Sequence, residues 1–149
     1  MIASIRPHAW DLPLFLHVLG AMVLVGAVLA VLLLTLAAWR KPQLPVLARS
    51  SFWTLLVAAI PAYVVMRGAA QWVYSKEGFS GTNDPTWLGI GFMVADVGLL
   101  LLLVTTGVAF WWMRSGKAVA GRIVAGLSCV YLVLLTIAWL AMSGKWGSG

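Results

Sequence analysis

The 149-residue chain is 62% hydrophobic and 9% charged, whereas soluble globular domains carry about 25% charged residues. This composition excludes an ordinary soluble domain and indicates a polytopic membrane protein. The net charge of +6 does not indicate a nucleic-acid partner, because most basic residues flank apolar segments, where they serve as topology signals.

Four apolar stretches are each long enough to cross a bilayer, which takes about 20 residues. They cover residues 12–39, 52–74, 87–113 and 123–142. Tryptophans stand near the ends of these stretches, at the level where indole rings favour the membrane interface. The sequence therefore predicts an all-α fold. We expect one transmembrane domain, residues 1–149, built as a four-transmembrane-helix up-down bundle with an outer loop at 75–86.

The distribution of lysine and arginine predicts the orientation of these spans. The segments 40–51 and 114–122 carry six basic residues, namely Arg40, Lys41, Arg49, Arg114, Lys117 and Arg122. Because basic loops stay in the cytoplasm, we expect both segments there and both termini outside. The predicted location is a bacterial inner membrane, crossed several times.

Three ionisable residues, His17, Arg67 and Asp96, lie inside three different predicted spans. A charge in hydrocarbon is costly, so each of them needs a partner. All three are expected in the outer half of the bundle, where an ion pair between Arg67 and Asp96 would be the cheapest arrangement for both charges. Such a pair is compatible with a structural role and with a functional one.

The second span carries a polar stripe. Tyr63, Arg67 and Gln71 recur every four residues and therefore share one helix face. We expect this face to look inward, toward Asp96, and to form a polar site. Pro61 is expected to kink the same span, because proline removes a backbone hydrogen bond one turn earlier.

His17 admits three interpretations: a hydrogen-bonded packing role, a haem or metal ligand, and a proton-relay or substrate role. Thioethers of Met66, Met93 and Met142 could join it around Cu(I), although methionine is also a common filler of apolar cores. No recognisable metal motif is present. Cys129 lies within an apolar span and is expected to be a buried, inert thiol.

Short segments resemble known families. Residues 16–21 (Leu-His-Val-Leu-Gly-Ala), residues 76–78 (Lys-Glu-Gly) and the end at 139–145 resemble small bacterial four-helix integral membrane proteins of uncharacterised type. These uncharacterised proteins are distantly similar to the copper-resistance D family and to the membrane-bound protoporphyrinogen oxidases. The latter resemblance implies haem b ligated by His17. The chain departs from that group in lacking an intramembrane lysine and in carrying Arg67 and Asp96, and under a haem hypothesis Arg67 would neutralise a propionate. A second histidine ligand is not available on the same face, because His8 precedes the span and lies opposite.

Three functions follow as hypotheses. The most specific is haem b binding or redox chemistry through His17. The alternative is a non-catalytic membrane subunit or assembly factor in which Arg67 and Asp96 form a structural ion pair. Proton, ion or copper transport is the third. The expected partners are the lipid bilayer and either further copies of the chain or a larger membrane complex, and the absence of a catalytic motif favours a role other than that of an enzyme.

Overall fold

A computed structural model describes residues 11–40, 45–77 and 86–144, and within them the chain is entirely helical apart from one tight turn. Helix α1 spans Asp11–Arg40, α4 spans Thr86–Ser115 and α5 spans Ala118–Gly144. The second rod consists of α2 (Pro45–Thr54), the π-helical segment η2 (Leu55–Ala59) and α3 (Ile60–Glu77). Each of the four rods is long and apolar enough to cross a membrane, which confirms the predicted all-α four-span bundle.

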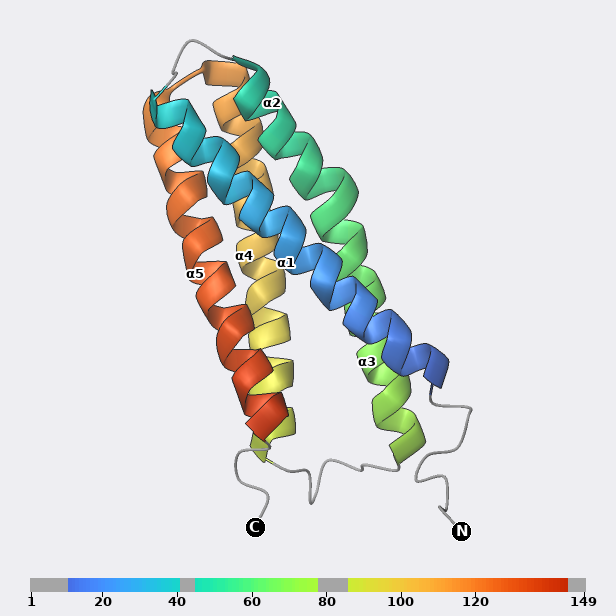
Figure 1. Cartoon of the computed structure of the whole chain (residues 1–149). Coiled ribbons are helices and arrows are strands. Elements are labelled where there is room, and N and C mark those ends of the chain that lie inside the picture. Colours follow the sequence, from blue (N-terminus) through green and yellow to red (C-terminus); the bar gives the residue numbers. More distant parts are fainter. Residues whose placement is uncertain (1–10, 41–44, 78–85, 145–149) are drawn as a thin grey trace.

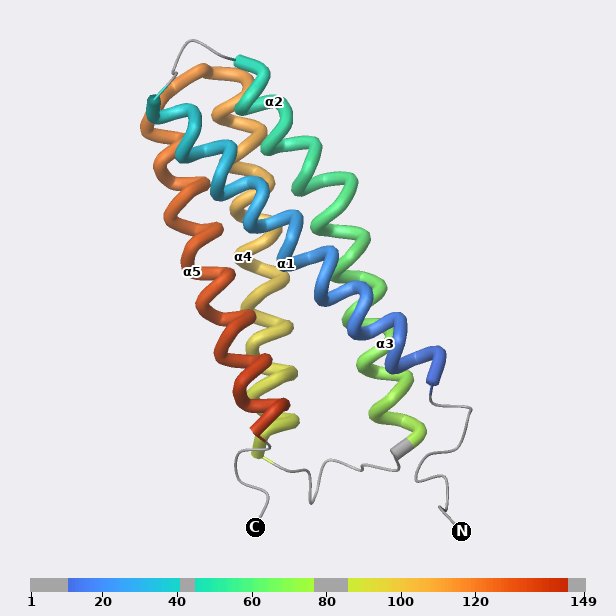
Figure 2. Tube along the Cα trace, viewed as in Figure 1, coloured from blue at the N-terminus to red at the C-terminus, as the bar shows by residue number. Residues whose placement is uncertain are grey.

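The four rods run up and down and pack in two pairs (Figure 1). Helix α4 lies along α5, while α1 crosses the bundle and lies along α3. Near the α1–α2 connection all the rods are close, whereas α3 and α4 separate toward the end where α1 begins (Figure 2). The flank between α3 and α4 is therefore the least closely packed side of the bundle.

The helices extend beyond the predicted apolar stretches. The predicted loop at 40–51 is helical from Pro45 onward, and the predicted loop at 114–122 shrinks to Gly116 and Lys117. Gly116 has a φ of 64°, the left-handed conformation that ends α4 and allows the tight turn into α5. A helix of 30 residues is about 45 Å long, whereas the hydrocarbon core of a bilayer is roughly 30 Å thick. An apolar stretch in the sequence marks only the part of the helix inside the hydrocarbon.

The core and the outer surface are both apolar. Leu24, Leu55, Leu102 and Val124 are fully buried, while many leucines, valines and tryptophans are exposed on the outside. Such a surface suits contact with lipid chains. The prediction of a buried Cys129 was wrong, because this residue is exposed on α5. An all-round apolar helix gives no pattern that tells its buried face from its lipid face.

The expected irregularity at Pro61 takes the form of a π-helical segment. Proline has no backbone N–H and crowds the preceding turn, so the α-helical hydrogen-bond pattern cannot run through this position unchanged. The backbone N–H of Ile60 instead donates to the carbonyl of Leu55, five residues earlier. Segments of this kind are a recognised source of helix bending, and here one lies just before the polar stripe of α3.

Candidate polar site between α3 and α4

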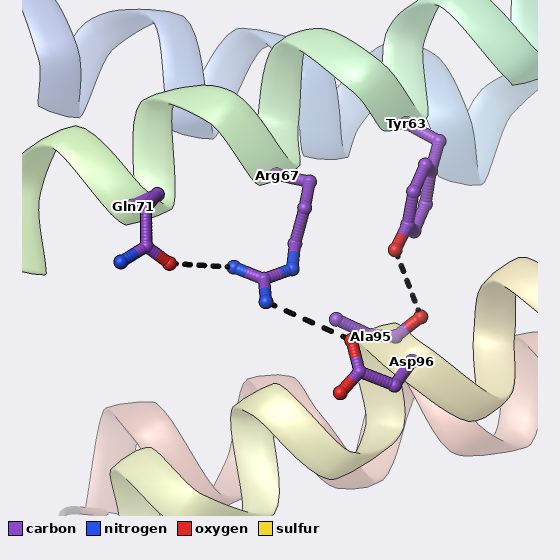
Figure 3. Close-up of polar contacts among 5 residues, drawn as sticks. All are labelled: Tyr63, Arg67, Gln71, Ala95 and Asp96. Carbon is purple, nitrogen blue, oxygen red and sulfur yellow. Dashed lines mark hydrogen bonds and ion pairs between the residues drawn. The ribbon is translucent and has the colours of Figure 1, made fainter. Parts of the chain in front are cut away.

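Arg67 of α3 is the centre of a polar cluster that bridges to α4 (Figure 3). Its Nη2 lies 3.7 Å from Oδ1 of Asp96, and its Nη1 donates a hydrogen bond of 3.1 Å to Oε1 of Gln71. The guanidinium carbon also lies 4.6 Å from the ring centroid of Phe92, a distance typical of a cation–π contact. Arg67 thus has one partner of opposite charge, one amide and one aromatic ring.

Tyr63 makes a second link between the two helices. Its hydroxyl donates a hydrogen bond of 3.0 Å to the backbone carbonyl oxygen of Ala95, the residue before Asp96 (Figure 3). The tyrosine side chain is buried, so this bond satisfies a hydroxyl that has no access to water. Tyr63 and Arg67 therefore both contact the same stretch of α4, while Gln71 contacts Arg67 from its own helix.

Asp96 does not point inward. Its side chain is 71% exposed, compared with 29% for Arg67. The buried stripe of α4 is formed by Gly91, Val94, Gly98, Leu102, Thr105 and Ala109. At about 100° per residue, Asp96 lies roughly opposite that stripe, together with the exposed Met93 and Leu100. Tyr63 thus points inward as expected, whereas Asp96 does not. The outer face of α4 is as apolar as its packed face, so the sequence does not show which face packs against the bundle.

Both charges lie deep in the span. Arg67 and Asp96 are each about 15 Å from the helix ends at Glu77 and Thr86, at 1.5 Å per residue. Insertion scales give about 2.5–3.5 kcal/mol for an aspartate at the centre of a span, which is an upper bound for a carboxylate at this depth. Arg67 offsets part of this cost from one side only, since most of the Asp96 side chain has no protein over it.

His17 belongs to a different contact. Its Nδ1 lies 3.0 Å from the carbonyl oxygen of Met66, and since a carbonyl only accepts, Nδ1 donates the hydrogen bond. In a neutral ring this leaves Nε2 as an acceptor. One turn further, Gly20 lets α1 touch the backbone of α3, because a Cβ there would lie 2.8 Å from the backbone nitrogen of Met66. His17 therefore stabilises the α1–α3 crossing, while the side chain of Arg67 reaches toward α4.

The residues proposed for metal binding do not gather in one place. Met66 is buried at the α1–α3 contact, Met93 is 64% exposed on α4, and Met142 packs against Gly91 between α4 and α5. Among the described residues no group of three His, Cys, Asp or Glu side chains could hold a metal ion. The arrangement gives the copper hypothesis no support.

Sequence reasoning missed two residues near this region, Phe92 and Tyr131. Phe92 stacks on Arg67. The buried hydroxyl of Tyr131 on α5, like that of Ser128, has no hydrogen-bond partner within the described part of the chain. Tyr131 fills the space left by Gly98, where a Cβ would lie 2.7 Å from its ring. A tyrosine in the middle of an apolar span is a signal that could have singled out Tyr131.

Comparison with known proteins leaves the family open. No protein-family model, curated protein or solved structure matches this chain. The resemblance to membrane oxidases and copper-resistance proteins therefore rests on the short segments that first indicated it. The architecture itself describes the chain as a small four-helix membrane protein.

Proposed function

We propose that this protein is a non-catalytic membrane subunit that associates with a second copy of itself through the exposed face of α4. This Asp96 face consists of Gly89, Met93, Asp96, Leu100, Leu103 and Gly107. The observation that carries the proposal is the exposure of Asp96, 71% of whose side chain is uncovered at about 15 Å from the helix end. A single chain would leave that carboxylate against lipid.

A second copy fits the charges of the site. Arg67 and Asp96 lie at equal depth on neighbouring helices that flank the opening between α3 and α4. A twofold axis along the membrane normal that runs beside the Arg67–Asp96 pair would bring the Asp96 of each copy next to the Arg67 of the other. In a twofold contact, any residue pair across the interface occurs twice. Two ion pairs would then become a ring of four alternating charges.

The shape of the Asp96 face also suits close helix packing. Gly89 and Gly107 are exposed on it, and a Cβ built at either position meets no atom within 4 Å. Within one chain these glycines are not needed for packing. Small residues on a lipid-facing helix surface allow two backbones to approach, which is how membrane helices associate in the absence of a hydrophobic drive.

The test is co-purification of two differently tagged copies expressed together and extracted in mild detergent. The native copies should purify together, and Asp96→Leu in both copies should abolish the association. Cys129→Ser supplies the control, since it alters an exposed position on α5 away from the Asp96 face. Association that survives Asp96→Leu, or native copies that never co-purify, would contradict the proposal.

Haem b binding through His17 is the second candidate, and one observation favours it. The hydrogen bond from Nδ1 to the Met66 carbonyl fixes the tautomer that leaves Nε2 as a possible axial ligand. The expected role of Arg67 at a propionate fits less well, since its guanidinium already engages Asp96, Gln71 and Phe92. Haem would supply one-electron chemistry, with His17 holding it from α1.

An absorption spectrum of protein purified with haem supplied tests this candidate. Haem binding predicts a Soret band that His17→Ala removes, while His17→Ala remains monodisperse on gel filtration. Lack of the band in the native protein, or its persistence in His17→Ala, excludes His17 as the ligand. Neither result bears on association through α4, so the two candidates are tested independently.

A further inference from the structure

A cavity of about 330 Å³ lies at the opposite end of the bundle from the polar site. It is lined by residues of α1, α2, α4 and α5, and Trp39, Trp112 and Arg122 are the large side chains among them. Ala38 and Ala48 contribute small apolar side chains to its wall. The cavity is thus mainly apolar and has one guanidinium group.

Close packing of α4 against α5 shapes the apolar wall. Trp112 is buried, and its ring lies against Gly121, where a Cβ would be 3.0 Å from the indole. Any side chain at Gly121 would push the indole out of place. Gly121 therefore allows the Trp112 indole to lie against α5, and Trp112 lines the same cavity as Arg122, the residue after Gly121.

The charge around the cavity is one-sided. The basic end, defined by Arg40, Arg49, Arg114, Lys117 and Arg122, contrasts with the four acidic residues of the chain, which are Asp11, Glu77, Asp84 and Asp96. None of those four belongs to the segments that form the basic end. Arg114 and Lys117 lie over the rings of Phe110 and Trp111, at 5.2 Å and 6.0 Å from their centroids. Within the described residues, no acidic side chain forms an ion pair with Arg122.

We infer that this cavity binds the head group of an anionic phospholipid, with its phosphate on the guanidinium of Arg122. A planar guanidinium donates two parallel hydrogen bonds to phosphate, and the surrounding positive charge attracts an anionic head group. Trp39 and Trp112 lie at the level where indoles meet the glycerol region of a bilayer. The apolar wall then accommodates the start of the acyl chains.

A lipid fits these surroundings better than a soluble phosphate. The cavity lies at the ends of membrane-spanning helices, where lipid phosphates are concentrated, and it combines one cation with an apolar wall. A soluble anion would contact only the guanidinium of Arg122 and make no use of the apolar wall. The two sources of phosphate can therefore be separated by asking whether inorganic phosphate competes with the lipid.

The test measures lipid retention by native mass spectrometry of the full chain, with phosphatidylglycerol and phosphatidylcholine as probes. We expect the native protein to prefer phosphatidylglycerol, and Arg122→Gln to weaken that binding about fivefold. Arg49→Gln is the matched control, because it removes the same charge from the basic end without lining the cavity. It should change binding by less than about twofold, because Arg49 would not contact the phosphate directly. Both arginines are exposed, so neither change is expected to unfold the chain.

Three results would overturn the inference. Equal binding of the two lipids by the native protein would show that the cavity does not select an anionic head group. Equal losses in Arg122→Gln and Arg49→Gln would assign the preference to diffuse surface charge. Full displacement of phosphatidylglycerol by excess inorganic phosphate would assign the cavity to a soluble anion.

Discussion

The guanidinium of Arg67 on α3 and the carboxylate of Asp96 on α4 lie 3.7 Å apart on the flank where the two helices separate. The arginine is the better covered partner, since 29% of its side chain is exposed compared with 71% for the aspartate. The pair therefore joins the two halves of the bundle and also presents a charge to the outside. Both properties can be tested by substitution.

Removal of one charge should cost more than removal of both. Asp96→Leu leaves the partly buried Arg67 without a counter-charge, and we expect a loss of about 1–2 kcal/mol in the free energy of unfolding. The double variant Arg67→Met, Asp96→Leu should regain most of the lost stability, because no unpaired charge then remains. Chemical denaturation in detergent measures the free energy of unfolding of both variants. A double variant less stable than Asp96→Leu alone would show that the pair does not act as a unit.

The α1–α3 crossing should depend on Gly20 and not on Gly26, six residues further along α1. Gly20→Ala places a Cβ 2.8 Å from the backbone nitrogen of Met66, so the helices must separate and the His17 hydrogen bond must lengthen. We expect a loss of about 1–3 kcal/mol. Gly26→Ala meets no atom within 4 Å and should be neutral or slightly stabilising. Equal effects of the two substitutions would contradict the close approach.

Two tyrosines should respond differently to loss of the hydroxyl group. Tyr63→Phe removes the bond to the Ala95 carbonyl and should destabilise the protein by about 1 kcal/mol. Tyr131→Phe removes a buried hydroxyl that has no partner among the described residues, and should be neutral or stabilising. Thermal unfolding of both variants in detergent compares them. A marked loss in Tyr131→Phe would mean that its hydroxyl is satisfied by a bound water or another group.

The four-helix architecture could be predicted from the sequence because membrane insertion depends on the length and hydropathy of each apolar stretch. The lengths of the apolar stretches gave four helices. Helix ends were less accessible, since Pro45–Thr54 is helical although Arg49, Ser50 and Ser51 interrupt its apolar residues. Backbone hydrogen bonding continues a helix past the hydrocarbon, and hydropathy does not report it.

The site was only partly predictable. A spacing of four residues placed Tyr63, Arg67 and Gln71 on one face, and depth brought Arg67 level with Asp96. Which side of α4 packs inward could not be derived, because Met93 and Leu100 outside are as apolar as Val94 and Leu102 inside. That ambiguity produced the expectation of an inward Asp96.

The orientation of the chain remains a prediction from its basic residues. In a Cys129→Ser background, Ser75→Cys should react with a membrane-impermeant maleimide in intact cells, because it lies at the end predicted to be outside. Ser115→Cys, next to the turn at Gly116, should react only after permeabilisation. Both serines are exposed, so access to the reagent reports the side of the membrane. The reverse labelling pattern would invert the predicted orientation.

Cysteine cross-linking in native membranes tests association through the Asp96 face most directly. Leu100 is 65% exposed and lies about one turn from Asp96, so Leu100→Cys in the Cys129→Ser background should form a disulfide-linked dimer under mild oxidation. The native chain, with Cys129 on α5 as its single cysteine, should form no disulfide-linked dimer under the same conditions. A Leu100→Cys chain that forms no disulfide-linked dimer, or one that cross-links no better than the native chain, would contradict the proposed interface.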